Sequence, residues 1–295
     1  NKISFDYFIT SKNYIKMIVY FNDKYIPHDE VKISPFDRSF LFSDGVYEAL
    51  RTYNGKLFRL QDHLERLKYS LQELEISFKD FDQLENIFKK LSEINNIKTE
   101  YSVYLQITRG VSFPRTHNYE NNLTPNVFAF AKPIKDNSKE KKIGIKVILE
   151  KDLRWLRCDI KSTSLLSSVM ANQNAIRNNA FEAILFRDDI ITEGSHTNFF
   201  AVKNNKIYTA PLSNYILSGI TRKEILELCK ENKIDFFEEH ITINKLKDYD
   251  EFFLTGTTTE VTPVIQIDDW IVGDGKPGNI TRTIQELFIN EVKQV

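Results

Sequence analysis

Lys161 is the residue whose type and place best fit covalent chemistry in this sequence. It lies in the segment RWLRCDIKSTSLL, between a predicted strand and a predicted helix, where a side chain can project into a cleft. Most lysines in such a place are simply solvated. A lysine amine whose pKa is lowered by burial or by cationic neighbours instead acts as a nucleophile and forms a Schiff base with a carbonyl. Arg154 and Arg157 stand nearby, and position alone leaves both interpretations open.

A second candidate is Glu193, which ends a predicted strand and precedes Gly194 in TEGSHTNFF. A carboxylate at this point can be an ordinary turn residue. It can also hold a proton on a heterocyclic nitrogen, as an anion facing a pyridinium does. The spacing does not decide between the two.

Two turns have the composition of an anion site. In LSGITRKE, Gly219 precedes a predicted helix, and Thr221 with Glu224 matches the capping-box pattern. Free N–H groups at a helix start suit phosphate. In LTGTTTEVTP, residues 254–263, threonines surround Gly256 and offer hydroxyl and N–H donors. Each turn alone is better explained as a plain structural turn, whereas two in one predicted domain favour an anion site more strongly.

Composition limits the class of protein. The 295 residues include 40 Lys+Arg and 41 Asp+Glu, a net charge of -1, which excludes a whole-chain electrostatic footprint for nucleic acid. Hydrophobic content of 41% indicates a folded chain, and its apolar runs are too short for a transmembrane helix. Two cysteines are too few for a disulfide framework or a four-ligand zinc site. We therefore expect a cytoplasmic globular protein without a metal site, a nucleic-acid partner or a membrane partner.

Periodicity divides the chain into two parts. Apolar residues at helical spacing predict helices over 60–76 and 81–94, and alternation predicts strands over 101–109 and 126–132. Residues 133–142, PIKDNSKEKK, are polar and lack apolar periodicity, so they are the expected domain linker. The pattern then restarts with strands over 143–150, 182–187, 190–193, 199–203 and 206–209, and with helices over 165–176, from Thr221 and from Thr281.

The order of these elements predicts two α+β domains, because strands and helices do not alternate strictly. We expect a small domain over 17–132 and a large domain over 143–295. Residues 1–16 are expected to be an N-terminal extension, since they lack the apolar stretch of a secretory signal and are poor in arginine. A hairpin follows directly after Met17, with its turn at Asn22 and Asp23.

Four segments in order carry a family resemblance: RWLRCDIKS, TEGSHTNFF, LSGITR and GTTTEVTP. They resemble the class IV, or fold type IV, aminotransferases that depend on pyridoxal 5'-phosphate, as does the upstream FSDGVYEALRTYNGKLFRLQDHLERL. The resemblance runs from about Met17 onward, and RWLRCDIKS and PRTH are most similar to D-amino-acid aminotransferase. It implies a small α/β N-terminal domain and a larger pseudo-barrel domain, with the cofactor between them.

The resemblance also implies roles in binding the cofactor. Lys161 resembles the lysine that holds the cofactor covalently and then moves the proton, and Glu193 resembles the carboxylate that pairs with the pyridine nitrogen. Arg66 resembles the phosphate-binding arginine, although it lies off the apolar stripe of its helix and would otherwise be assigned to a solvated face. The other implied cofactor residues are Leu217, Gly219, Ile220, Thr221, Gly256 and Thr257.

Substrate binding is implied at a smaller set of residues. Arg115 and His117 match a pair that traps the substrate carboxylate together with Tyr47, and an arginine fork suits this task. The resemblance places this pair on the partner subunit, so a homodimer is expected, whereas PRTH taken alone is a polar loop. Tyr104 and Thr258 match further pocket residues; Tyr104 taken alone is the outer face of a strand.

The expected activity is transfer of an amino group between a D-amino acid, such as D-alanine, and a 2-oxo acid, such as 2-oxoglutarate, by ping-pong kinetics. The first alternative is a branched-chain L-amino-acid aminotransferase, which Gly256 and Arg51 favour and which Leu166 disfavours because those enzymes typically have tyrosine there. An (R)-amine transaminase and an aminodeoxychorismate lyase come next. A binding or structural dimer without catalysis is the alternative from another class, and Lys161, Glu193 and Arg66 argue against it.

Overall fold

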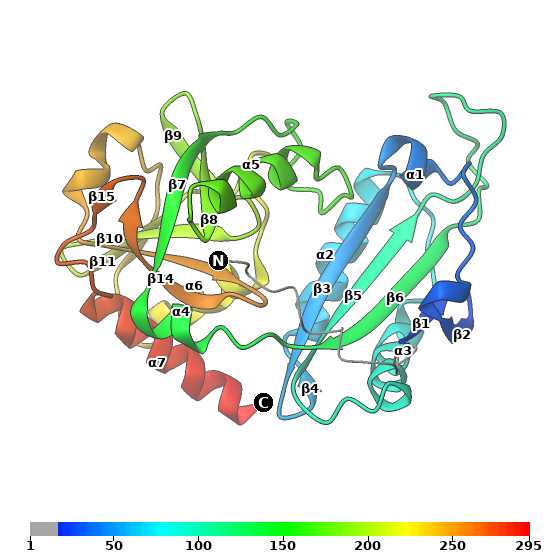
Figure 1. Ribbon diagram of the computed structural model, residues 1–295, viewed down its shortest axis with the longest axis horizontal. Coiled ribbons are helices and arrows are strands. Elements are labelled where there is room, and N and C mark those ends of the chain that lie inside the picture. Colours follow the sequence, from blue (N-terminus) through cyan, green and yellow to red (C-terminus); the bar gives the residue numbers. More distant parts are fainter. Residues whose placement is uncertain (1–16) are drawn as a thin grey trace.

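The computed structural model describes residues 17–295, so the expected extension over 1–16 lies outside the described residues. Two sheets stand side by side, each with helices of its own (Figure 1). This mixed arrangement confirms the predicted α+β fold class. Within residues 17–295, no helix is both long enough and apolar enough to cross a bilayer.

The first sheet is antiparallel throughout, with the strand order β2-β1-β6-β5-β3-β4. Its strands are β1 Ile18–Phe21, β2 Lys24–Pro27, β3 Gly45–Tyr53, β4 Lys56–Leu57, β5 Tyr101–Thr108 and β6 Asn126–Pro133. The predicted hairpin is confirmed, because β1 and β2 pair and both turn residues, Asn22 and Asp23, have positive φ. Positive φ at both positions is typical of the tight hairpin turn.

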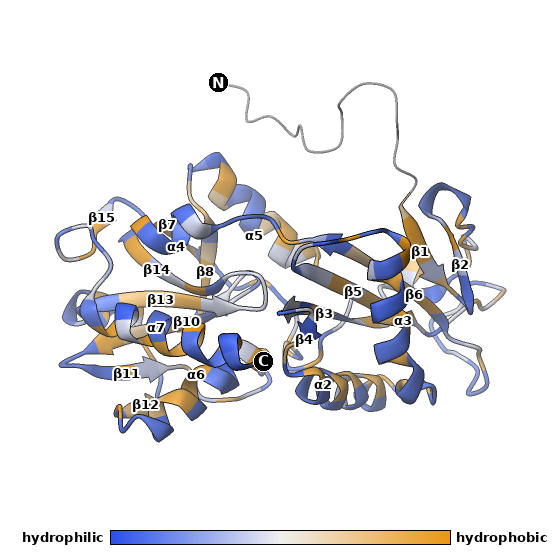
Figure 2. Cartoon of the chain, turned by 90° about the horizontal axis from the view of Figure 1, so that it is seen from below, coloured by the Kyte–Doolittle hydropathy of each residue, from blue (hydrophilic) through white to orange (hydrophobic). Residues whose placement is uncertain are grey.

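Two helices cover this sheet, α2 (Leu60–Glu73) and α3 (Phe81–Ile94). In Figure 2 both are banded in blue and orange, as expected when one helix face packs on a core. Both predicted helices are confirmed, although α2 ends at Glu73 rather than at residue 76. The short helix α1 (Arg38–Phe42) and the 3-10 turn η1 (His28–Glu30) lie near the sheet edge.

The second sheet has nine strands in the order β12-β11-β10-β13-β14-β7-β8-β9, with β15 paired to β14. The strands are β7 Ile145–Lys151, β8 Glu182–Arg187, β9 Ile190–Gly194, β10 Asn198–Lys203, β11 Lys206–Thr209, β12 Phe236–Glu238, β13 Glu251–Gly256, β14 Glu260–Ile267 and β15 Trp270–Ile271. The helices are α5 Leu166–Arg177, α6 Ile220–Glu231 and α7 Asn279–Gln294, with a 3-10 segment, η2 Ile243–Asp248. The strands predicted over 182–187 and 206–209 are confirmed to the residue.

Residues 254–263 differ from their prediction as a turn. Most of the segment belongs to β13 and β14, and only residues 257–259 form the turn. Gly256 and Glu260 pair across it. The threonines and valines of this segment favour extended backbone, so the hydroxyl-rich run is a tight connection between two central strands.

The chain crosses between the two sheets through residues 133–144 (Figure 1). The sequence predicts a domain linker over 133–142, and helix α4 (Ser138–Ile143) begins within this segment. The side chains of Arg282 and Gln285 on α7 donate hydrogen bonds to carbonyl oxygens of Lys141 and Lys142, which gives the last turn of α4 partners that no local pattern shows.

Candidate active site

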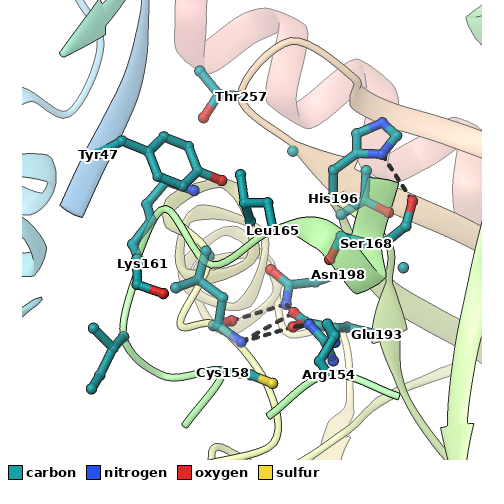
Figure 3. Close-up of a pocket in the computed structure, with 18 of the residues that line it drawn as sticks. Tyr47, Arg154, Cys158, Lys161, Leu165, Ser168, Glu193, His196, Asn198 and Thr257 are labelled. Carbon is teal, nitrogen blue, oxygen red and sulfur yellow. Dashed lines mark hydrogen bonds and ion pairs between the residues drawn. The ribbon is translucent and has the colours of Figure 1, made fainter. Parts of the chain in front are cut away.

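A pocket lies between the two sheets, and side chains from both line it (Figure 3). Ten of the predicted site residues meet there: Tyr47, Arg66, Lys161, Glu193, Leu217, Gly219, Ile220, Thr221, Gly256 and Thr257. Four do not line it within this chain: Tyr104, Arg115, His117 and Thr258. The residues that line it span more than 200 positions of the sequence, from Tyr47 to Thr257. Only the packing of the two sheets brings the distant ones together.

Lys161 lies in the segment between β7 and α5, as its sequence predicts. Its backbone is fixed to the first sheet, because its carbonyl oxygen accepts a hydrogen bond from the Tyr47 N–H at 3.0 Å and its N–H donates to Ser70 Oγ at 3.1 Å. The next residue, Ser162, bridges to Val46 on β3. The amine Nζ lies 4.3 Å from the centroid of the Tyr47 ring. The segment therefore presents one amine at a defined place in the pocket.

Glu193 is a buried carboxylate with a full set of partners. It accepts hydrogen bonds from Arg154 Nη1 at 2.5 Å, from Asn198 Nδ2 at 3.0 Å and from the Leu217 N–H at 3.1 Å. Burial raises the pKa of Glu193, and the Arg154 guanidinium counteracts that rise. Such a fixed carboxylate can face a protonated ring nitrogen in the pocket.

Arg154 connects Glu193 to a second buried carboxylate. Its Nε and Nη2 donate to Asp152 at 2.9 and 2.8 Å. Burial opposes ionisation of Asp152, but the hydrogen bonds from Arg154 and the ion pair with Arg187 outweigh it and hold the pKa of that carboxyl well below its usual range. The sequence interpretation treated Arg154 only as a cationic neighbour of Lys161. Its pairing with Glu193, 39 residues away, leaves no signal in local spacing.

Arg66 does not lie on a solvated helix face, which was the alternative to its implied role. Its side chain is buried on α2 and donates to Glu48 from Nε and Nη2, both at 2.8 Å, and to the Ser218 carbonyl oxygen at 2.9 Å. Glu48 also contacts His63 Nδ1 at 2.7 Å. Burial raises the pKa of Glu48, but Arg66 and His63 outweigh it and hold that pKa well below its usual range. Neither Glu48 nor His63 was singled out from the sequence.

The start of α6 differs from its predicted capping box. The N-cap is Gly219, no side chain caps the helix, and Glu224 accepts a hydrogen bond from Arg59 Nε at 2.6 Å instead. A Cβ on Gly219 would lie 1.9 Å from Asn198 Oδ1, so the close approach of β10 requires glycine here. The first residues of the helix, Ile220 and Thr221, line the pocket.

The turn after β13 completes this end of the pocket. Gly256 and Thr257 line it, and so does Thr255 at the end of β13. The hydroxyl of Thr255 is buried and has no hydrogen-bond partner within the described part of the chain. A buried hydroxyl is seldom left unpaired, so this one is available to a molecule in the pocket. Thr255 belongs to the threonine run of the sequence but was not among the predicted site residues.

The donor set fits pyridoxal phosphate. A guanidinium, a helix start and threonine hydroxyls can bind a phosphate. The carboxylate of Glu193 can pair with a ring nitrogen, and the amine of Lys161 can attack an aldehyde. Within residues 17–295, no cluster of three or more His, Cys, Asp or Glu side chains is arranged to hold a metal ion.

Arg115 and His117 lie on the loop between β5 and β6, exposed to solvent. The Arg115 guanidinium lies 4.4 Å from the centroid of the Phe42 ring, and the His117 ring lies 5.5 Å from it. Arg38 holds this loop through the carbonyl oxygens of residues 116–118. The chain therefore presents the pair away from its own pocket.

The other two residues adjoin residues that line the pocket. Tyr104 on β5 stacks on Tyr47, with ring centroids 5.6 Å apart, and burial raises the pKa of Tyr104 to about 12. The carbonyl oxygen of Thr258 accepts a hydrogen bond from Asn137 Nδ2 at 2.8 Å.

Residues 45–267 match the family model described as amino-transferase class IV. The chain belongs to the class IV aminotransferases. This aminotransferase is 43% identical to the D-alanine aminotransferase of Bacillus licheniformis, over 94% of its own length and 97% of the relative's. It is 42% identical to the D-alanine aminotransferase of Staphylococcus haemolyticus, over 92% and 96%.

Solved structures of the same fold include branched-chain aminotransferases. The enzyme from Escherichia coli matches this aminotransferase with a TM-score of 0.84 and 26% identity, over 93% of this chain and 94% of that one. The enzyme from T.th., solved with pyridoxamine 5'-phosphate, matches with the same TM-score and identity, over 94% of both chains. Both confirm the fold type IV architecture, and class IV aminotransferases depend on pyridoxal phosphate.

Proposed function

We propose that this class IV aminotransferase transfers an amino group between a D-amino acid, such as D-alanine, and a 2-oxo acid, such as 2-oxoglutarate, by ping-pong kinetics. The observation that carries this function is one pocket in which the Lys161 amine lies among a buried carboxylate, a buried guanidinium and a helix start. The two D-alanine aminotransferases described above, similar along almost their whole length, support the D-amino-acid substrate.

The cofactor is pyridoxal 5'-phosphate. When bound, it supplies an aldehyde that exchanges for the amino group and a ring that accepts electrons from the substrate α-carbon. Arg66, the N–H and hydroxyl donors of Ile220 and Thr221, and Thr257 bind the phosphate. The Glu193 carboxylate pairs with the ring nitrogen, and Leu217 packs on the ring face. Gly219 and Gly256 allow the backbone to approach.

Lys161 has two roles in this reaction. Its amine would hold the cofactor covalently between turnovers, and Nζ would move the proton at the substrate α-carbon. The contacts that support these roles are the two backbone hydrogen bonds that fix the segment to β3 and α2. They leave the amine as the part of Lys161 that is free to reorient.

A second copy of the chain completes the site. Large apolar side chains are exposed around the pocket and along α5: Leu153, Leu156, Leu166, Val169, Met170 and Leu212. Exposed apolar side chains that gather into a patch mark interaction surfaces, and we assign these to the contact between two copies. In the homodimer that we propose, Arg115 and His117 of each subunit bind the substrate carboxylate in the other subunit's pocket, together with Tyr47. We assign Tyr104 and Thr258 to substrate binding as well.

The remaining assignments follow from the same interpretation. We place the enzyme in the cytoplasm, since the thiols of Cys158 and Cys229 are both free. The small domain comprises residues 17–132, the linker 133–142 and the large domain 143–295. Amino acids and 2-oxo acids are its small-molecule partners.

A branched-chain L-amino-acid aminotransferase is the second candidate, and the likeness to solved enzymes of that name favours it. The two candidates are separated by supplying D-alanine or L-leucine with 2-oxoglutarate and measuring the 2-oxo acid formed. We expect product from D-alanine. Product from L-leucine alone would contradict the proposed function.

A further inference from the structure

The turn that carries Thr257 has two sides, and helix α4 lies on the side opposite the pocket. Thr257 lines the pocket, whereas the next residue, Thr258, accepts a hydrogen bond from Asn137 directly before α4, at 2.8 Å. Glu260, the first residue of β14 after the turn, pairs with Lys141 on α4. Two contacts therefore join the turn and the strand that follows it to the segment that connects the sheets.

Glu260 also joins the turn to the first sheet. Its Oε1 accepts a hydrogen bond from the Tyr53 hydroxyl at 2.7 Å and lies 2.8 Å from Arg51 Nη1, and both partners are on β3. Its carboxylate is buried, and although burial raises its pKa, Arg51 and Lys141 outweigh that effect and lower it. Glu260 has a φ of 55°, a left-handed conformation that is unfavourable for a residue other than glycine. These partners favour the conformation that closes the turn.

Helix α4 is itself held in place. Gln285 Nε2 on α7 donates to the carbonyl oxygens of Lys141 at 3.0 Å and Val261 at 2.9 Å, so one amide joins α4 to β14. Arg282 Nη1 donates to the Lys141 carbonyl oxygen at 3.0 Å. The position of the turn thus depends on a helix anchored to the large sheet and on a carboxylate anchored to the small one.

We propose that Asn137 and Glu260 are positioning residues for the phosphate of the cofactor, acting through the turn that presents Thr257. The proposal rests on the proposed function, which places a phosphate at Thr257. The segment between the domains is then part of the phosphate site rather than a passive connection. Asn137 reaches the phosphate only through the turn, so its removal lowers affinity for phosphorylated ligands alone.

The test measures the affinity of the apoenzyme for pyridoxal phosphate and for pyridoxal, which lacks the phosphate. Asn137→Ala should misplace the turn and so weaken the hydrogen bond from Thr257 to the phosphate. Because a hydrogen bond to a charged group contributes strongly, pyridoxal phosphate should bind about tenfold more weakly. Pyridoxal binding should stay unchanged. Glu260→Gln, which keeps the shape of the side chain, should act in the same direction. Lys139→Ala, at an exposed position on the same helix, is the matched control and should leave both affinities unchanged.

A second arm shows whether the effect passes through Thr257. In the Thr257→Val background, Asn137→Ala should cause no further loss of affinity for pyridoxal phosphate. Three results would each overturn the positioning role. They are equal losses of affinity for both ligands, additive losses in the double variant, and unchanged affinity in Asn137→Ala. Wild-type apoenzyme that binds neither ligand would contradict the proposed function instead.

Discussion

The amine of Lys161 lies 4.3 Å from the centroid of the Tyr47 ring, and the Tyr47 N–H donates to the carbonyl oxygen of Lys161 at 3.0 Å. One residue of the small sheet therefore contacts both the backbone and the amine of the lysine. A lysine over a tyrosine ring gains roughly 0.5–2 kcal/mol, more as water is excluded. The place of the amine in the pocket thus depends on how the two sheets pack.

Tyr47→Phe separates the ring from the hydroxyl. The ring contact with Lys161 is kept, so covalent capture of the cofactor should be unchanged. The hydroxyl that we propose to contact the substrate carboxylate is lost, and the KM for D-alanine should rise about tenfold, or ~1.4 kcal/mol. Steady-state kinetics and borohydride trapping of the cofactor check this. Tyr47→Ala is the comparison, and it should weaken both covalent capture of the cofactor and binding of D-alanine. An unchanged KM in Tyr47→Phe would remove Tyr47 from the carboxylate site.

Arg154→Met should destabilise the protein strongly. It leaves Glu193 buried without its cation and Asp152 with Arg187 alone, and breaking a buried ion pair from one side typically costs about 3–5 kcal/mol. Arg154→Lys keeps the charge but loses the fork that binds both carboxylates, so we expect an intermediate loss. Urea unfolding of the three proteins measures the free energies. Equal stability of wild type and Arg154→Met would show that Arg154 does not compensate these carboxylates.

The ion pair of Glu48 with Arg66 predicts a loss of stability in acid. Because the folded-state pKa of Glu48 lies below its unfolded value, the pair contributes stability above about pH 4.3, and this contribution is lost as the pH falls below that value. Glu48→Gln should be less stable at pH 7 by about 3–5 kcal/mol, since Arg66 loses its buried partner. Its unfolding free energy should also vary less between about pH 5 and pH 3. Parallel pH profiles for the two proteins would contradict this account.

The proposed site, shared between two subunits, predicts complementation between two inactive variants. Lys161→Ala lacks the amine, and the Arg115→Ala, His117→Ala double variant lacks the carboxylate trap. In an equal mixture that has exchanged subunits, half of the dimers are mixed and each has one intact site. Activity should therefore return to about one quarter of the wild-type value. A mixture that stays inactive after exchange, confirmed by mass spectrometry of the dimers, would place Arg115 and His117 in their own subunit's site.

Local pattern predicted much of the fold. Leu84, Ile87, Phe88 and Leu91 recur at helical spacing and are buried on α3, and the alternation over 101–108 matches the pleat of β5. Local pattern gave a wrong prediction at Glu224. The residues Thr221 and Glu224 match a capping box, but the Glu224 carboxylate binds Arg59, 165 residues away. Periodicity carries no information about such distant partners.

The candidate site, like the fold, could be predicted only in part from the sequence. Motif order identified Lys161, Glu193 and Arg66, and the pocket brings all three together. The groups that hold them came only from the structure: Arg154 lies beside Glu193, and Glu48 pairs with Arg66. Asn137 binds the turn from 121 residues away. Each of these contacts joins residues from separate segments of the chain, so it exists only after those segments have packed together.

The most direct test compares D-alanine with L-alanine in the first half of the reaction. The two donors have the same atoms and differ only in handedness, so the comparison isolates the geometry of the site. The holoenzyme is mixed with each donor in the absence of any 2-oxo acid, and conversion to the aminated cofactor is followed by absorbance together with pyruvate formation. The account predicts rapid conversion and one pyruvate per site with D-alanine, and little with L-alanine. Conversion by L-alanine and not by D-alanine would contradict it.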